Sequence, residues 1–195
     1  MSGPEVRGPA VRGWCPGALR PMPSGDGLVV RIRPAGGRLS PQQADGVAKL
    51  AEALGNGLID LTSRANVQLR GITAESHRPL VEGLRRLGLV DASPEDEARR
   101  NIVVSPFARD HDGTETIATA LAAALASPDA PDLPGKFGFA VDCGNWPVLR
   151  DTPADIRIER SATGELSVCA DGAGTGAPAA VASAASIAIG LARWF

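Results

Sequence analysis

Basic and amide side chains recur at alternate positions in two short stretches of the sequence. The residues that share this spacing are Arg31 and Arg33 in the first stretch and Arg64, Asn66, Gln68 and Arg70 in the second. Side chains on a β-strand alternate between the two faces of a sheet, so each set is expected on a single face. Guanidinium groups bind carboxylate or phosphate through paired hydrogen bonds, and clustered arginines repel one another unless an anion neutralises them. The pattern therefore predicts a binding face for a ligand rich in acid groups.

Two further basic residues, Arg100 and Lys136, stand at the entrances of predicted strands and would extend this face. Arg100 precedes an apolar run, and Lys136 is one of only two lysines in the chain. The competing interpretation is a solvated sheet face with surface ion pairs, which is the common fate of strand arginines. The spacing alone does not decide between the two interpretations.

Apolar periodicity predicts the elements that carry these residues. Ser40, Pro41 and Gln43 have the spacing of a capping box with proline at the first helical position. The elements expected in this part of the chain are strands at residues 28–33, 57–62 and 66–72 and helices at residues 41–54 and 79–87. A β-α-β-β-α order is typical of part of a ferredoxin-like layer with its helices on one sheet face. The arginine-rich face is then the face that the helices leave open.

The rest of the chain predicts a second α/β unit. Residues 93–97 are polar and are expected to form a linker between the units. The elements expected after it are strands at residues 101–104, 137–141, 155–159 and 166–170 and helices at residues 114–126 and 178–192. The predicted fold class is α/β (α+β). The predicted organisation is a Pro/Gly-rich lead-in at residues 1–26, a first domain at residues 27–92 and a second domain at residues 98–195.

The composition argues against several classes of function. With 195 residues and a net charge of -2, the chain has no global field to hold nucleic acid or an anionic membrane. The three cysteines, Cys15, Cys143 and Cys169, are too few for the four thiolates of a conventional iron–sulfur cluster, and His77 and His111 lack the spacing of a metal pair. We expect Cys143 and Cys169 in the strand core and both histidines at the surface. The odd cysteine count and the absence of an apolar leader favour a reducing, cytoplasmic location.

Several blocks of the sequence closely resemble the N-terminal half of the precorrin-3B synthase family, within the nitrite/sulfite reductase superfamily. The longer blocks are CPGALRPM at residues 15–22, SGDGLVVRIRP at 24–34, GGRL at 36–39 and GLIDLTSRANVQLRG at 57–71. Two shorter blocks are RNIVVSP at residues 100–106 and LPGKF at residues 133–137. The resemblance covers about residues 13–142 well and the remainder loosely.

This resemblance implies a fold and a set of binding residues. Each half of a superfamily member pairs a ferredoxin-like half domain with an α/β domain, and basic residues hold the carboxylates of a sirohaem or related tetrapyrrole. The family's basic positions fall on Arg31, Arg33, Arg64, Arg100 and Lys136. Together with the face predicted above, the candidate tetrapyrrole-binding residues are Arg31, Arg33, Arg64, Asn66, Gln68, Arg70, Arg100 and Lys136. Gly138 stands where the reductases carry a second lysine, which favours the synthase branch.

The resemblance also implies an activity and partners. The synthase family converts precorrin-3A by oxygen-dependent hydroxylation and lactone formation, on the aerobic route to cobalamin. It uses a [4Fe-4S] cluster whose cysteines lie in a second half, so we expect no cofactor on this chain alone and assign no catalytic residue. The apolar residues 179–195 suggest a covering partner, either a second half-unit chain or another copy of this one. A non-catalytic tetrapyrrole-binding half or carrier and a sulfite or nitrite reductase fragment remain alternatives.

Overall fold

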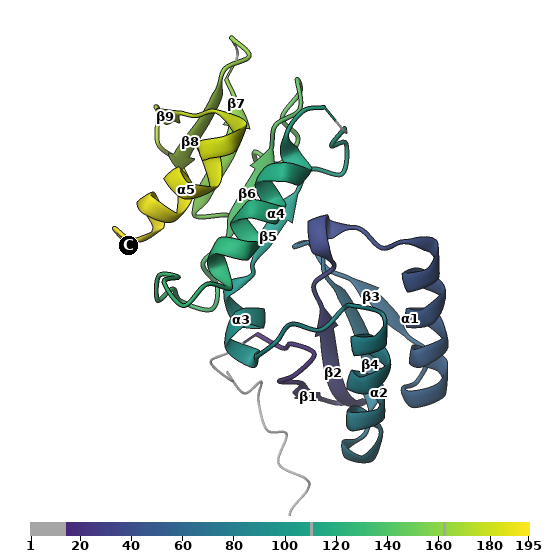
Figure 1. The fold of residues 1–195 in the computed structure, drawn as a ribbon. Helices are drawn as coiled ribbons and strands as arrows, with labels where there is room; N and C mark the ends of the chain where they lie inside the picture. Colours follow the sequence, from purple (N-terminus) through teal and green to yellow (C-terminus); the bar gives the residue numbers. More distant parts are fainter. Residues whose placement is uncertain (1–14, 110, 162) are drawn as a thin grey trace, which may run out of the picture.

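The computed structural model describes residues 15–109, 111–161 and 163–195 and contains two β-sheets with separate cores (Figure 1). The first sheet has the order β1-β2-β4-β3 and is antiparallel throughout. Its elements are β1 (Met22–Ser24), β2 (Gly27–Ile32), α1 (Pro41–Leu54), β3 (Ile59–Leu61), β4 (Val67–Ile72) and α2 (Ala74–Arg86). This order contains the predicted β-α-β-β-α layer, with β1 added at its edge.

Strand alternation sets the two faces of the first sheet. Val30 and Ile32 of β2 and Leu69 of β4 are fully buried against α1 and α2. Arg31 and Gln68 are opposed in the β2–β4 register and therefore project from the other face. The sequence prediction that Arg31 and Gln68 lie on the face away from the helices is confirmed.

The second sheet has the order β5-β6-β7-β8-β9, and α4 and α5 share its larger core. Strands β5, β6 and β7 run parallel, whereas β8 and β9 are antiparallel additions. The elements are β5 (Ile102–Val104), α4 (Thr114–Leu125), β6 (Phe139–Asp142), β7 (Ile156–Arg160), β8 (Leu166–Ala170), β9 (Ala177–Pro178) and α5 (Val181–Ala192). The predicted α/β (α+β) fold class is confirmed.

Two boundaries in the middle of the chain differ from the sequence prediction. The stretch predicted as a linker forms a short helix, α3 (Pro94–Arg99), because Ser93 caps it by accepting a hydrogen bond from the Asp96 amide. Helix α2 begins at Ala74 rather than at Pro79, because Thr73 and Ser76 form a capping box that places Pro79 inside the helix. A short 3-10 turn, η1 (Ala35–Gly37), follows β2.

Some side-chain environments also differ from those expected. Cys143 is fully buried, as predicted, but Cys169 is only half-buried on β8. His111 is exposed, whereas His77 is partly buried and its Nε2 lies 2.9 Å from the Ala18 carbonyl oxygen. Across the described part of the chain, no helix has the length and apolar character needed to cross a membrane.

Candidate functional site

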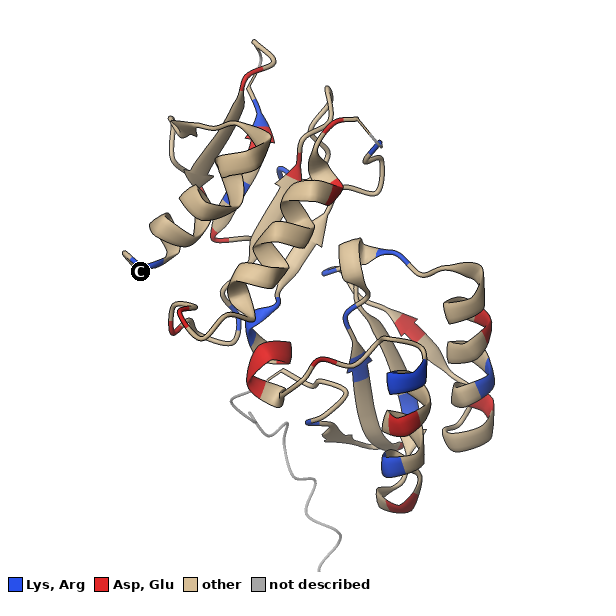
Figure 2. Cartoon of the chain, in the orientation of Figure 1, with Lys and Arg blue, Asp and Glu red and all other residues tan. Residues whose placement is uncertain are grey.

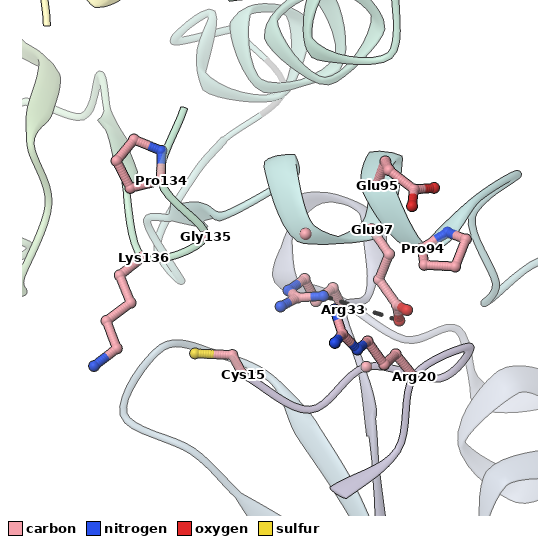
Figure 3. Close-up of a pocket in the computed structure, with 11 residues that line it drawn as sticks. Cys15, Arg20, Arg33, Pro94, Glu95, Glu97, Pro134, Gly135 and Lys136 are labelled. Carbon is pink, nitrogen blue, oxygen red and sulfur yellow. Dashed lines mark ion pairs between the residues drawn. The ribbon is translucent and has the colours of Figure 1, made fainter. Parts of the chain in front are cut away.

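A cavity of about 460 Å³ opens between the two sheets, beside helix α3 (Figure 3). One wall is the segment that precedes β1, which contributes Cys15, Gly17 and Arg20. Arg33, directly after β2, and residues of α3 form the floor, and residues 134–136 before β6 close the opposite side. Segments that are far apart in the sequence therefore meet at one site.

Arg33 is the most buried cation of this cavity. Its side chain is only 6% exposed, and its Nη1 lies 3.9 Å from Glu97 Oε1. Among the described residues, neither its Nε nor its Nη1 has a hydrogen-bond partner. Burial lowers the pKa of Arg33, the nearby Glu97 opposes that shift, and the positive charge of Arg31 adds to it. A buried guanidinium with unsatisfied donors is costly unless an acceptor reaches it.

Glu97 fixes the shape of the cavity from α3. It is 3% exposed, and its two carboxylate oxygens accept the amide hydrogens of Ala18 at 2.5 Å and Leu19 at 3.1 Å. Gly17 permits this approach, because a Cβ at that position would lie 2.2 Å from Glu97 Oε2. Figure 2 shows α3 as an acidic segment placed between the two sheets. The carboxylate thus holds the segment before β1 against α3.

Arg31 lies on the open face of the first sheet and is held by Gln68. Its Nε and Nη2 donate to Gln68 Oε1 at 3.0 and 2.6 Å. Burial lowers the pKa of Arg31, and an interaction with the Cys15 thiol opposes that shift, while the charge of Arg64 adds to it. Arg31 is therefore close to both Cys15 and Arg64, which links the sheet face to the cavity wall.

Arg64 and Lys136 approach each other from the two units. The turn that carries Arg64 is closed by Thr62 and Asn66, which exchange backbone and side-chain hydrogen bonds. Arg64 Nη1 lies 3.4 Å from the Lys136 carbonyl oxygen. The Lys136 side chain is exposed in the cavity wall, and no described residue pairs with its ammonium group.

Two of the predicted arginines are instead occupied by carboxylates of the chain itself. Arg70 donates to Asp26 at 2.9 and 3.0 Å and to Asp60 at 3.3 Å. Arg100 makes two hydrogen bonds of 2.8 Å to Asp91 and donates to the Arg33 carbonyl oxygen. Both guanidinium groups are therefore paired with carboxylates of the chain itself, and their predicted role in holding an external acid group stays a prediction.

Comparison with known proteins agrees with this architecture. Residues 20–87 match the family model described as the nitrite/sulfite reductase ferredoxin-like half domain. The chain is 36% identical over 157 residues to a precorrin-3B synthase of Sinorhizobium sp, a match that covers 78% of this chain and 33% of that protein. The chain belongs to the nitrite/sulfite reductase superfamily.

Two reductases of the superfamily are also similar to the chain. It is 31% identical over 135 residues to a ferredoxin–nitrite reductase of Synechococcus elongatus, covering 64% of this chain and 26% of that protein. It is 29% identical over 78 residues to the sulfite reductase [NADPH] subunit beta of Saccharomyces cerevisiae, covering 40% of this chain and 5% of that subunit. The superfamily match thus spans about a third or less of each relative's length.

The superfamily suggests an iron–sulfur cluster, and the described residues do not fit one. Cys15, Cys143 and Cys169 are all free thiols. Within residues 15–109, 111–161 and 163–195, no group of three or more His, Cys, Asp or Glu side chains is placed to bind a metal ion.

Three contributors to the site were not predicted from the sequence. Glu97 and Asn101 are buried polar residues, and Asn101 Nδ2 donates to the Phe137 carbonyl oxygen at 3.1 Å, which anchors the segment carrying Lys136. Arg20 lines the cavity. Glu97 stands in a polar stretch, which gives no sequence signal of burial. Asn101 stands directly before a buried strand, and that position is a weak signal of burial.

Proposed function

We propose that this superfamily member is the first half-unit of a precorrin-3B synthase-like protein of aerobic cobalamin biosynthesis, and that it binds a polycarboxylate tetrapyrrole at the cavity beside α3. The observation that carries the proposal is the buried Arg33 guanidinium in the cavity floor, whose Nε and Nη1 donors receive no hydrogen-bond acceptor from any described residue. The likeness to the synthase of Sinorhizobium sp names the substrate class.

The proposed cationic site consists of Arg31, Arg33, Arg64 and Lys136. Arg33 is desolvated, so a carboxylate that reaches it gains more than it would at the surface. Lys136 and Arg64 stand at the more exposed side, where they would orient the remaining acid groups of the ring rim. Gln68 holds Arg31 without neutralising it, because an amide oxygen carries no charge.

The redox part of the proposed function lies outside the described site. The oxygen-dependent hydroxylation and lactone formation are proposed to need a cluster from a second half, supplied by another chain or by another copy arranged against this one. This chain would bind and orient the tetrapyrrole. Two other candidates keep the same binding site. One is a non-catalytic carrier half, and the other is a sulfite or nitrite reductase fragment, which agrees with the likeness to the nitrite reductase.

The binding proposal is tested by titrating the full chain with an octacarboxylate porphyrin and following the porphyrin absorbance. We expect Arg64→Gln and Lys136→Gln each to weaken binding by about fivefold or more, since each removes a charge–carboxylate contact worth about 1 kcal/mol. Arg78→Gln is the matched control, because Arg78 is exposed on α2 and pairs only locally with Glu82. Equal affinity of all four proteins would overturn the proposal.

A second measurement separates the three candidates. A sirohaem-like absorbance band in the purified protein would favour the reductase fragment. A colourless protein that binds the porphyrin favours the synthase half or the carrier. Oxygen uptake with a precorrin, in the presence of a cysteine-bearing partner half, then supports the synthase, and its absence in every such mixture supports the carrier.

A further inference from the structure

The three thiols of the chain lie in three different electrostatic environments. Cys143 is fully buried, and burial raises its pKa to about 11. Cys169 is half-buried, and burial and the neighbouring Glu159 raise its pKa as well. Cys15 is half-buried in the wall of the cavity. Only the third environment is both open and rich in cations, which are the conditions that favour a reactive thiol.

The groups around Cys15 attract an anion. Arg20, Arg33 and Lys136 line the same cavity, and the Cys15 thiol is among the groups that raise the pKa of Arg31 against the effect of burial. Figure 3 shows the Cys15 sulfur directed toward the side of the cavity on which Lys136 lies. Of the two acidic side chains in the lining, Glu95 is exposed and Glu97 is engaged by backbone amides.

Arg33 supplies an independent indication that this cavity accepts an acidic ligand. Its side chain is 94% buried, since only 6% is exposed, and within the described part of the chain its Nε and Nη1 have no hydrogen-bond partner. Unsatisfied buried donors of a charged group are rare in folded proteins and mark places where an acceptor is missing. A carboxylate carried into the cavity beside Cys15 would meet this group.

We propose that Cys15 is a modification site that forms a mixed disulfide with a small disulfide carrying carboxylate groups, which the cavity cations draw in. The Cys15 thiol loses its proton to solvent, and its sulfur attacks one sulfur of the reagent. The reagent's S–S bond breaks, a new S–S bond forms at Cys15, and the other half leaves as a thiolate that can take up a proton. Cys15 is oxidised and the reagent's disulfide is reduced, so no further oxidant is needed.

The attached group would occupy the space in which the tetrapyrrole is proposed to bind. This consequence rests on the proposed function, whereas the modification itself does not. A mixed disulfide at Cys15 is then incompatible with porphyrin binding, and a bound porphyrin protects Cys15. The oxidation state of one thiol would thereby control access to the cavity.

The test is the reaction of the native full chain with 5,5'-dithiobis(2-nitrobenzoate), a dianionic aromatic disulfide, followed by release of its coloured thiolate. We expect one fast-reacting thiol in the wild type, its loss in Cys15→Ser and its retention in Cys169→Ser. Cys169 is the matched control because it is also half-buried but has acidic neighbours. An unchanged fast phase in Cys15→Ser would overturn the proposal.

The role of charge is tested by comparing this reagent with the neutral 2,2'-dithiodipyridine. In the wild type we expect the anionic reagent to react with Cys15 faster than the neutral one. The ratio of the two rate constants should fall about threefold or more in Lys136→Gln. It should fall by a similar factor in 1 M salt, where charges are screened beyond about 3 Å. A ratio that neither change alters would overturn the proposed attraction.

Protection by the octacarboxylate porphyrin separates the two proposals. Fast, charge-dependent labelling of Cys15 that the porphyrin does not slow supports the modification site and contradicts the tetrapyrrole site. Porphyrin binding to a chain whose Cys15 is unreactive supports the tetrapyrrole site and overturns the modification.

Discussion

Glu97 and Arg33 form a buried ion pair in which the carboxylate directs its hydrogen bonds elsewhere. The Oε1 atom lies 3.9 Å from Arg33 Nη1, yet it accepts a 2.5 Å hydrogen bond from the Ala18 amide. Glu97 is therefore a counter-charge for Arg33 without satisfying its donors. The same carboxylate joins α3 to the cavity wall that contains Cys15, so charge balance and cavity shape depend on one residue.

Replacing Glu97 by alanine should destabilise the fold strongly. The change leaves Arg33 buried without a counter-charge and leaves two amides without acceptors, which together cost about 3–5 kcal/mol. Urea unfolding followed by circular dichroism measures the free energy of unfolding. Glu95→Ala is the matched control, because Glu95 is exposed on the same helix, and we expect a change within about 0.5 kcal/mol. Equal stability of the two variants would contradict the role given to Glu97.

Gly17 should be similarly intolerant of a side chain. Alanine at this position would place its Cβ 2.2 Å from Glu97 Oε2, so the segment before β1 or helix α3 must move. We expect a loss of about 1–3 kcal/mol in the free energy of unfolding, which is typical of forced overpacking. Gly25→Ala is the control, because no atom of the described residues lies within 4 Å of the Cβ position there. An unfolding midpoint of Gly17→Ala equal to that of Gly25→Ala would show that the close approach is not required.

The open face of the first sheet follows from strand alternation, which is why the sequence predicted it. Buried Val30 and Leu69 require Arg31 and Gln68 to project from the other side. Alternation does not, however, reveal which carboxylates lie nearby. Asp26 and Asp60 come from a turn and an edge strand, and their pairing with Arg70 depends on tertiary placement that no local pattern encodes.

The cavity itself was beyond sequence reasoning for the same reason. Ala18 and Glu97 are 79 positions apart, and their contact depends on how α3 sits between the sheets. The polar composition of residues 93–97 predicts a linker, whereas Ser93 caps a short helix there, and nothing in the composition alone distinguishes the two. By contrast, the capping box at Ser40 was predicted, because all of its partners lie within one turn.

Acid should weaken the tie between Asp26 and Arg70. The Arg70 hydrogen bond lowers the pKa of Asp26 from its ordinary value of 3.8 to about 2. Because the folded-state pKa lies below the unfolded value, the stabilisation is complete above about pH 4 and is lost as the pH falls toward 2. We expect Asp26→Asn to reduce the pH dependence of the urea midpoint in that window. The same fall of the urea midpoint below pH 4 in Asp26→Asn and in wild type would refute this assignment. Because the ion pair is at the surface, its contribution to the urea midpoint should shrink in high salt.

Asn101 should act on ligand binding by positioning Lys136. Its side chain donates to the Phe137 carbonyl oxygen at 3.1 Å and lies 3.4 Å from the Lys136 carbonyl oxygen, so it anchors the segment that closes the cavity. Asn101→Ala removes the donor and should cost about 1–3 kcal/mol in stability, because a buried carbonyl loses its partner. It should also weaken binding of the octacarboxylate porphyrin, whereas the control variant Arg78→Gln should bind it as tightly as the wild type. The discriminating measurement is the double variant Asn101→Ala/Lys136→Gln. If Asn101 acts through Lys136, the double variant binds no more weakly than Lys136→Gln alone, whereas additive losses would show that Asn101 influences the site independently.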